Sequence, residues 1–225
     1  QDADNLAWKL ATVLDGRASD ALLASYDVER IPAADENILN SSRSTDFMTP
    51  KSQAVRDIRD AVLALARDYG FARRMVNSGR LSVPAVFDGS PLNTPDKYAF
   101  GGSMRPGAAA LDAPVVMPDG ADWLLHQLGG EFTALLYLDD ANHALPDGWP
   151  CLLPTMVNPL VATPTSGPGV IGDPEGDMRM RYDLMAGTVY LIRPDQHVAA
   201  RTRSFSIVWL ENALARALGN LEDKP

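Results

Sequence analysis

The stretch FTALLYL, residues 132–138, decides the fold class of this chain. It is an almost unbroken apolar run, which is typical of a β-strand buried on both faces of a sheet. Its length of seven residues favours a strand over a helix. Other strand candidates flank it in the sequence, at 113–117, 156–163, 188–192 and 197–202. Short helical patterns separate these runs, so we predict an α/β (α+β) fold.

The end of the chain has a characteristic order of elements. Residues 188–192 and 197–202 flank Pro194-Asp195-Gln196, which predicts a β-hairpin. A helical stretch over 175–186 precedes the hairpin. A final helix follows it, with four apolar residues on one face: Ile207, Leu210, Leu214 and Leu218. This helix–hairpin–helix order resembles a thioredoxin-like fold, and we expect a thioredoxin-like α/β sandwich over residues 105–225.

The first third of the chain reads as helix. Leu6, Leu10, Val13 and Leu14 recur at helical spacing and predict a first helix with an apolar face, ended by Gly16. A second helix follows, and Pro32 is expected either to end it or to start the next helix, because an interior proline removes a backbone hydrogen bond. A third helix carries apolar residues at three- and four-residue steps: Val55, Ile58, Val62, Leu65 and Tyr69. Residues 79–107 are rich in glycine and proline, so we expect a domain boundary near residue 104.

Composition narrows the function classes. The 225 residues carry a net charge of −9, which disfavours nucleic acid as a partner. No apolar run is long enough to span a membrane. The single cysteine, Cys151, gives no disulfide framework, so we expect a cytoplasmic protein. The three histidines, His126, His143 and His197, have no ligand-like spacing, and we expect no metal site. The chain begins at Gln1 without a methionine, which we interpret as a fragment that starts just before a helix.

Three segments resemble the flavoprotein aromatic hydroxylases, the group that includes phenol, hydroxybenzoate and hydroxyphenylpropionate hydroxylases. The first is Asp-Ala-x-Asn-Leu-x-Trp-Lys-Leu, here at residues 2–10. The second is Tyr-x-x-Glu-Arg-x-Pro, here at residues 26–32. The third lies in LIRPDQHVAAR, residues 191–201, where Gln196 replaces the usual glycine. They follow the family's order along the chain, and together they are specific.

The resemblance implies an FAD- and NAD(P)H-dependent monooxygenase that hydroxylates a phenolic substrate, with the cofactor performing the oxygen chemistry. Residues 1–104 would then be the helical tail of the FAD- and substrate-binding region, and its FAD domain would lie upstream. No G-x-G-x-x-G occurs in the chain. We therefore expect no catalytic residue here, no FAD bound to the fragment, and an inactive fragment. Only Gln1 and Asp2 are placed near the isoalloxazine ring, because helix-start amides favour electron-rich groups.

Several residues have a structural reading beside a functional one. We expect Trp8 to pack between helices and Lys9 to meet a carboxylate, while Glu29 and Arg30 pair with neighbouring elements or with solvent. Cys151 lacks a second thiol, so the thioredoxin-like half should be redox-inactive. We interpret Asp139, Asp140 and His143 as a solvated acidic loop.

Two other function classes stay open. One is a redox or chaperone-like thioredoxin-fold protein. The other is a non-catalytic thioredoxin-fold module for interaction or oligomerisation. Apolar faces on the first and third helices also predict a homo-oligomer.

Overall fold

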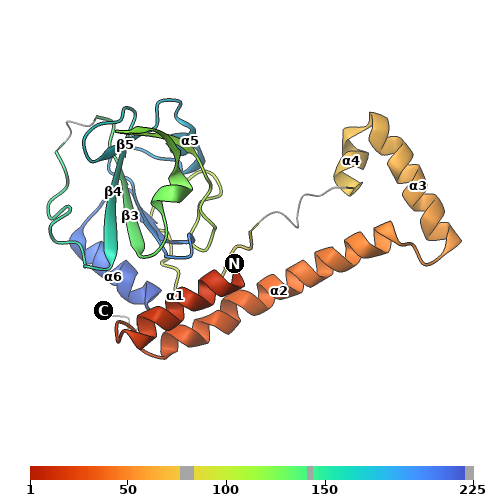
Figure 1. Ribbon diagram of the computed structural model, residues 1–225, viewed down its shortest axis with the longest axis horizontal. Helices are drawn as coiled ribbons and strands as arrows, with labels where there is room; N and C mark the ends of the chain where they lie inside the picture. The colour runs from red at the N-terminus through yellow and green to blue at the C-terminus, as the bar shows by residue number, and fades with distance from the viewer. Residues whose placement is uncertain (77–83, 141–143, 221–225) are drawn as a thin grey trace. The chain divides into compact units, whose positions relative to one another are not determined.

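The computed structural model describes residues 1–76, 84–140 and 144–220. It divides into two compact units. One comprises Gln1–Glu29 with Val86–Pro225, and the other comprises Arg30–Ala85. These units do not follow the expected division at residue 104, because the first helix packs with the sheet that lies more than 100 residues downstream. Figure 1 shows the helices and strands of both units.

The larger unit is built on a mixed seven-stranded sheet in the order β2-β1-β5-β4-β3-β6-β7. The strands are β1 (Pro114–Met117), β2 (Gly120–Trp123), β3 (Phe132–Tyr137), β4 (Val157–Thr163), β5 (Val170–Gly172), β6 (Val189–Ile192) and β7 (Val198–Thr202). Strands β3, β4 and β5 run parallel, and the remaining pairs are antiparallel. The predicted α/β class is therefore confirmed.

Strand β3 is central, and every one of its residues is buried. Phe132, Ala134 and Leu136 face one core, which includes Trp8 of the first helix and Leu210 and Leu214 of the last. Leu135 and Tyr137 face a second core, with Leu124, Ile171 and Tyr182. The apolar run of β3 thus fills both faces of the sheet, as its sequence predicted.

Helices and turns around the sheet follow the expected order with some differences in length. The last helix, α6 (Ile207–Ala217), begins at Ser206, whose hydroxyl accepts a hydrogen bond from the Trp209 amide. The stretch expected to be helical over 175–186 contains only the short α5 (Asp177–Arg181). A single 3₁₀ turn, η2 (Leu124–Gln127), follows β2. Strand β5 lies in a stretch rich in proline and glycine that is absent from the strands expected above, because three residues are too few to give a pattern.

The β6–β7 turn explains the one departure from the family motif. Gln196 has φ of 60°, in the left-handed region that favours glycine. Its side-chain amide donates to the carbonyls of Leu125 (3.0 Å) and Leu128 (3.3 Å). These two bonds fasten the turn to η2 and offset the backbone strain of a residue with a Cβ.

The first helix, α1 (Asp2–Leu14), buries a different face from the one predicted. Its buried residues are Asn5, Trp8, Lys9 and Thr12, whereas Leu14 is 83% exposed and Leu10 is 38% exposed. The apolar pattern therefore predicted the wrong face of α1 as the buried one. A polar and aromatic face packs inward because it meets charged partners from other elements.

The smaller unit is helical. Helix α2 (Ala21–Met48) begins in the larger unit and continues through Pro32, so the expected helix boundary at this proline, as an end or as a start, is wrong. Pro32 is exposed, and a helix can lose one backbone bond where solvent satisfies the freed carbonyl. Helices α3 (Gln53–Asp68) and α4 (Gly70–Val76) follow, and no residue of α3 is buried. Among the described helices, none combines the length and apolar character that a membrane span requires.

Candidate functional site

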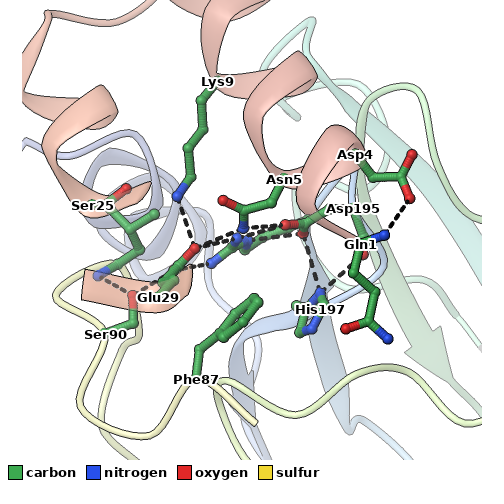
Figure 2. Close-up of polar contacts among 12 residues, drawn as sticks. Gln1, Asp4, Asn5, Lys9, Ser25, Glu29, Phe87, Ser90, Asp195 and His197 are labelled. Atoms are coloured by element: carbon green, nitrogen blue, oxygen red, sulfur yellow. Dashed lines mark hydrogen bonds and ion pairs between the residues drawn. The ribbon is translucent and has the colours of Figure 1, made fainter. Parts of the chain in front are cut away.

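The three motif segments meet at one buried cluster in the larger unit. Asn5 and Lys9 come from α1, Glu29 comes from α2, and Arg193 and Asp195 come from the β6–β7 turn. Figure 2 shows the side chains of Asn5, Lys9, Glu29 and Asp195 gathered at this cluster. We call these five residues the clasp.

Arg193 is the centre of the clasp, and its side chain is fully buried. Its guanidinium donates to both oxygens of Glu29, with Nη1–Oε1 at 2.6 Å and Nη2–Oε2 at 3.0 Å. It also donates to both oxygens of Asp195, with Nε–Oδ1 at 3.0 Å and Nη2–Oδ2 at 2.6 Å. One guanidinium thus binds two carboxylates in paired geometry, the strongest form of a charge-assisted hydrogen bond.

Helix α1 joins the clasp through two residues one helical turn apart. Lys9 Nζ donates to Glu29 Oε2 at 2.8 Å. The Asn5 amide donates to Glu29 Oε2 at 2.8 Å and to Asp195 Oδ2 at 2.9 Å, so it bridges both carboxylates (Figure 2). The Ser90 hydroxyl adds a further bond to Glu29 Oε1 at 2.6 Å. Every oxygen of Glu29 and Asp195 is therefore bonded inside the protein.

Aromatic rings enclose the clasp. The Arg193 guanidinium lies 5.2 Å from the centre of the Trp8 ring and 5.5 Å from that of Phe87. Phe87 in turn stacks on His197, with ring centres 4.2 Å apart. His197 Nδ1 lies 2.9 Å from the Asp195 carbonyl oxygen. These rings exclude water and strengthen the electrostatic interactions within the cluster.

The charges of the clasp balance at two positive and two negative groups. Burial alone would raise the pKa of Glu29, but Arg193 and Lys9 lower it to about 2. Burial opposes ionisation of Asp195 too, yet Arg193 and His197 hold the pKa of Asp195 well below its usual range. Burial lowers the pKa of Lys9, and Glu29 counteracts that effect. At neutral pH Glu29 and Asp195 are therefore ionised, and their carboxylate oxygens bond to groups inside the protein.

An open groove of about 490 Å³ lies beside the clasp, between the outer face of α1 and the β6–β7 turn. Asp4, Trp8 and Ala11 line one side, and Pro194, Asp195 and Gln196 line the other. Asp195 gives its carboxylate to Arg193 and Asn5, so the groove holds no free acid or base for catalysis from this residue.

The predicted residues have the following outcomes. Lys9 meets a carboxylate and Trp8 packs in the core, with its ring edge-on to Phe132 at 5.6 Å, as expected. Glu29 pairs with neighbouring elements, also as expected, and Arg30 is buried. Gln1 and Asp2 lie exposed at the start of α1, and their position near a flavin stays a prediction. Our sequence reasoning missed the joint role of Asn5, Arg193 and Asp195.

The remaining candidates are Cys151 and the acidic loop at Asp139 and Asp140. Cys151 is exposed and is the only cysteine of the chain. Asp139 and Asp140 are exposed, while His143 lies outside the described residues. Within the described ranges, no group of three His, Cys, Asp or Glu side chains could hold a metal ion.

Comparisons with known proteins agree with the motifs. Residues 1–41 match the family described as FAD binding domain. The chain is 30% identical to a 3-(3-hydroxy-phenyl)propionate/3-hydroxycinnamic acid hydroxylase of Mycobacterium sp. (strain KMS), over 88% of this chain and 36% of that protein. It is also 30% identical to the tetracenomycin A2 monooxygenase-dioxygenase of Streptomyces glaucescens, over 100% of this chain and 38% of that protein.

A solved structure shares the fold. The flavin-dependent monooxygenase PieE, solved in complex with FAD and substrate, matches 96% of this chain and 43% of its own, with a TM-score of 0.67 and 23% identity. The chain thus spans well under half of the length of the proteins it matches. The motifs, the family match over residues 1–41 and the relatives agree, and together they support a member of the FAD-dependent aromatic hydroxylase family.

Proposed function

We propose that this chain is the C-terminal portion of an FAD- and NAD(P)H-dependent monooxygenase that hydroxylates a phenolic aromatic compound. The observation that carries the proposal is the clasp. The three segments that resemble the hydroxylase family meet there, although up to 190 residues separate them. A chance likeness of short motifs gives no reason for their polar residues to bind one another. The names of the hydroxyphenylpropionate hydroxylase and the tetracenomycin monooxygenase support an aromatic substrate.

The residues of this chain do not fit the pyrophosphate of FAD. Such a site needs a glycine turn between a strand and a helix start, where backbone amides meet the phosphates. The first turn of α1 carries Asp2 and Asp4, whose charge repels a phosphate. The start of α1 could offer only its backbone amides, which suit one edge of the uncharged isoalloxazine ring. We therefore place the pyrophosphate site in an upstream part of a longer polypeptide, with Gln1 and Asp2 beside the isoalloxazine.

Within that enzyme, the larger unit has a structural task. Its strand order β4-β3-β6-β7 followed by α6 supports a thioredoxin-like domain over residues 105–225. With Cys151 as the only thiol, this domain would be redox-inactive, and the reducing cytoplasm is our proposed location. Flavin chemistry would belong to the cofactor, and this chain would hold α1 in place.

The proposal is tested by the activity of the longer polypeptide. Joined to the coding sequence upstream of Gln1, the protein should oxidise NADH or NADPH, and a phenolic substrate should accelerate that oxidation. Mass analysis should find the phenol enlarged by one oxygen atom. The 225-residue chain alone should oxidise neither nucleotide. A longer polypeptide that binds FAD but never oxygenates a panel of phenols would contradict the proposed reaction.

A second role, self-association, is favoured by the smaller unit. Its described residues bury only Arg30, Ala33 and Ala72, so it has no apolar core of its own. Exposed apolar side chains cover α3: Val55, Ile58, Leu63 and Leu65. Residues 30–85 carry nine Lys or Arg and six Asp or Glu, whereas the rest of the chain carries 11 and 23. This charge complementarity supports a second copy of the chain as the partner of α3.

A further inference from the structure

We infer that Arg193 and Asp195, in the β6–β7 turn, are positioning residues for the FAD-binding segment. This inference rests on the proposed function for its meaning in the enzyme. The geometry points to it without reference to any flavin, because it concerns how residues 1–41 are held.

The first step is the origin of the five clasp residues. Asn5, Lys9 and Glu29 all lie within residues 1–41, which match the FAD binding domain family. Arg193 and Asp195 lie more than 150 residues downstream, in the hairpin of the sheet. The clasp therefore joins the FAD-binding segment to a part of the chain outside that family match.

The second step is that Arg193 and Asp195 of the hairpin supply polar partners that the FAD-binding segment, residues 1–41, lacks by itself. Lys9 and Glu29 alone would leave one oxygen of Glu29 bonded only to Ser90. Arg193 binds both oxygens of Glu29, and Asp195 receives the second bond of the Asn5 amide. Since all four charged side chains are at most 2% exposed, water cannot replace a missing partner.

The third step is the direction in which the clasp acts. Asn5 lies one helical turn from the start of α1, and its backbone amide bonds to the Gln1 carbonyl at 2.9 Å. The side-chain amide of Asn5 donates hydrogen bonds to Glu29 at 2.8 Å and to Asp195 at 2.9 Å. The bond to Asp195 holds this turn of α1 against the hairpin. Arg193 fixes the same helix through the Trp8 ring, 5.2 Å away. The hairpin thus sets both the depth and the rotation of the first turns of α1, and with them the place of Gln1 and Asp2.

The matched control is Arg201 in β7. It is also buried, at 6% exposure, and pairs with Asp96 (Nη2–Oδ2 at 2.6 Å) and with the Met104 carbonyl at 3.0 Å. Both of these partners lie outside residues 1–41. Arg193→Gln and Arg201→Gln therefore each remove a buried arginine from the same hairpin, and only the first removes a contact with α1.

The first test is hydrogen exchange of the 225-residue chain. Exchange of the α1 amides should become at least tenfold faster in Arg193→Gln than in Arg201→Gln, at a temperature where circular dichroism shows both folded. If Arg193→Gln fails to fold, Asn5→Ala provides the same comparison, because it removes the bridge to both carboxylates without changing the charge. Equal α1 exchange in the control and in the clasp variant that folds would overturn the inference.

The second test uses the longer flavin-loaded polypeptide. The dissociation constant for FAD should rise at least tenfold in Arg193→Gln and stay within twofold of the unmodified protein in Arg201→Gln. An equal change in both variants would show a general loss of stability and would contradict a positioning role. If the unmodified polypeptide binds no FAD, the proposed function fails, while hydrogen exchange still decides whether the hairpin positions α1.

Discussion

Replacing Arg193 by methionine should destabilise the larger unit strongly. The variant keeps most of the side-chain volume but leaves Glu29 and Asp195, both buried, with Lys9 as the remaining clasp cation. Removing one partner of a buried ion pair costs about 3–5 kcal/mol, because the other charge stays without compensation. The total free energy of unfolding of a domain is about 5–15 kcal/mol, so this loss would be a large part of the stability of the larger unit. At about 2–4 °C per kcal/mol, the melting temperature should fall by roughly 6–20 °C.

Urea denaturation followed by tryptophan fluorescence measures the free energy of unfolding of the larger unit. The four tryptophans, Trp8, Trp123, Trp149 and Trp209, all lie in the larger unit, so the signal ignores unfolding of residues 30–85. Arg105→Gln is the control, because it breaks an exposed pair with Asp88 and should change stability by less than about 1 kcal/mol.

A double variant separates charge from packing. Adding Glu29→Gln to Arg193→Met removes one buried negative charge. The clasp then holds one positive charge, on Lys9, and one negative charge, on Asp195. It should recover at least about 1 kcal/mol of the loss, as expected when two partners of a buried pair are neutralised together. If Arg193→Met costs less than about 1 kcal/mol, the clasp does not stabilise the unit and the reasoning is refuted.

The remaining predictions concern pH, the thiol and assembly. The pKa of Glu29 is lower in the folded state, about 2 against 4.5 for the free group, so its contribution is complete above pH 4.5 and is lost as the pH falls toward 2; the slope of unfolding free energy against pH between these limits should be shallower in Glu29→Gln, and an equal slope would contradict the assignment. Cys151→Ser should leave every activity unchanged, and the chain should not reduce insulin with a dithiol; reduction that the variant loses would show a redox thiol. The 225-residue chain should form a dimer or larger species by light scattering. Ile58→Asp with Leu65→Asp should return it to a monomer, whereas Arg56→Lys, which keeps the charge on the other side of α3, should not. A monomer at all micromolar concentrations would count against self-association.

Sequence patterns predicted β3, β6 and β7 well, because these strands are buried on both faces. The run at 132–138 has no polar face, and only a central strand suits it, which the structure confirms as β3. The hairpin and α6 were also placed correctly, since a Pro-Asp turn and an apolar helical face are local signals. Strand β5 was missed because pairing with β4, rather than its own three residues, makes it a strand.

The clasp shows where sequence reasoning reaches its limit. Helical periodicity selected Leu6, Leu10, Val13 and Leu14 as the buried face of α1, yet Leu14 is 83% exposed. Polar Asn5 and Lys9 are buried instead, because partners from two distant segments satisfy them. Burial of a charge depends on such long-range partners, which no local pattern contains. The motif residues themselves were the available signal, since Asn5, Glu29, Arg193 and Asp195 all lie within segments that resemble the family.

The most direct test of the central claim is an FAD titration of two proteins, the 225-residue chain and the same chain joined to its upstream coding sequence. We predict that the longer protein is yellow and binds one FAD, and that the 225-residue chain stays colourless after incubation with FAD and gel filtration. Tight stoichiometric binding of FAD by the 225-residue chain would contradict the claim that the pyrophosphate site lies elsewhere, and a longer protein that binds no FAD would contradict the proposed function.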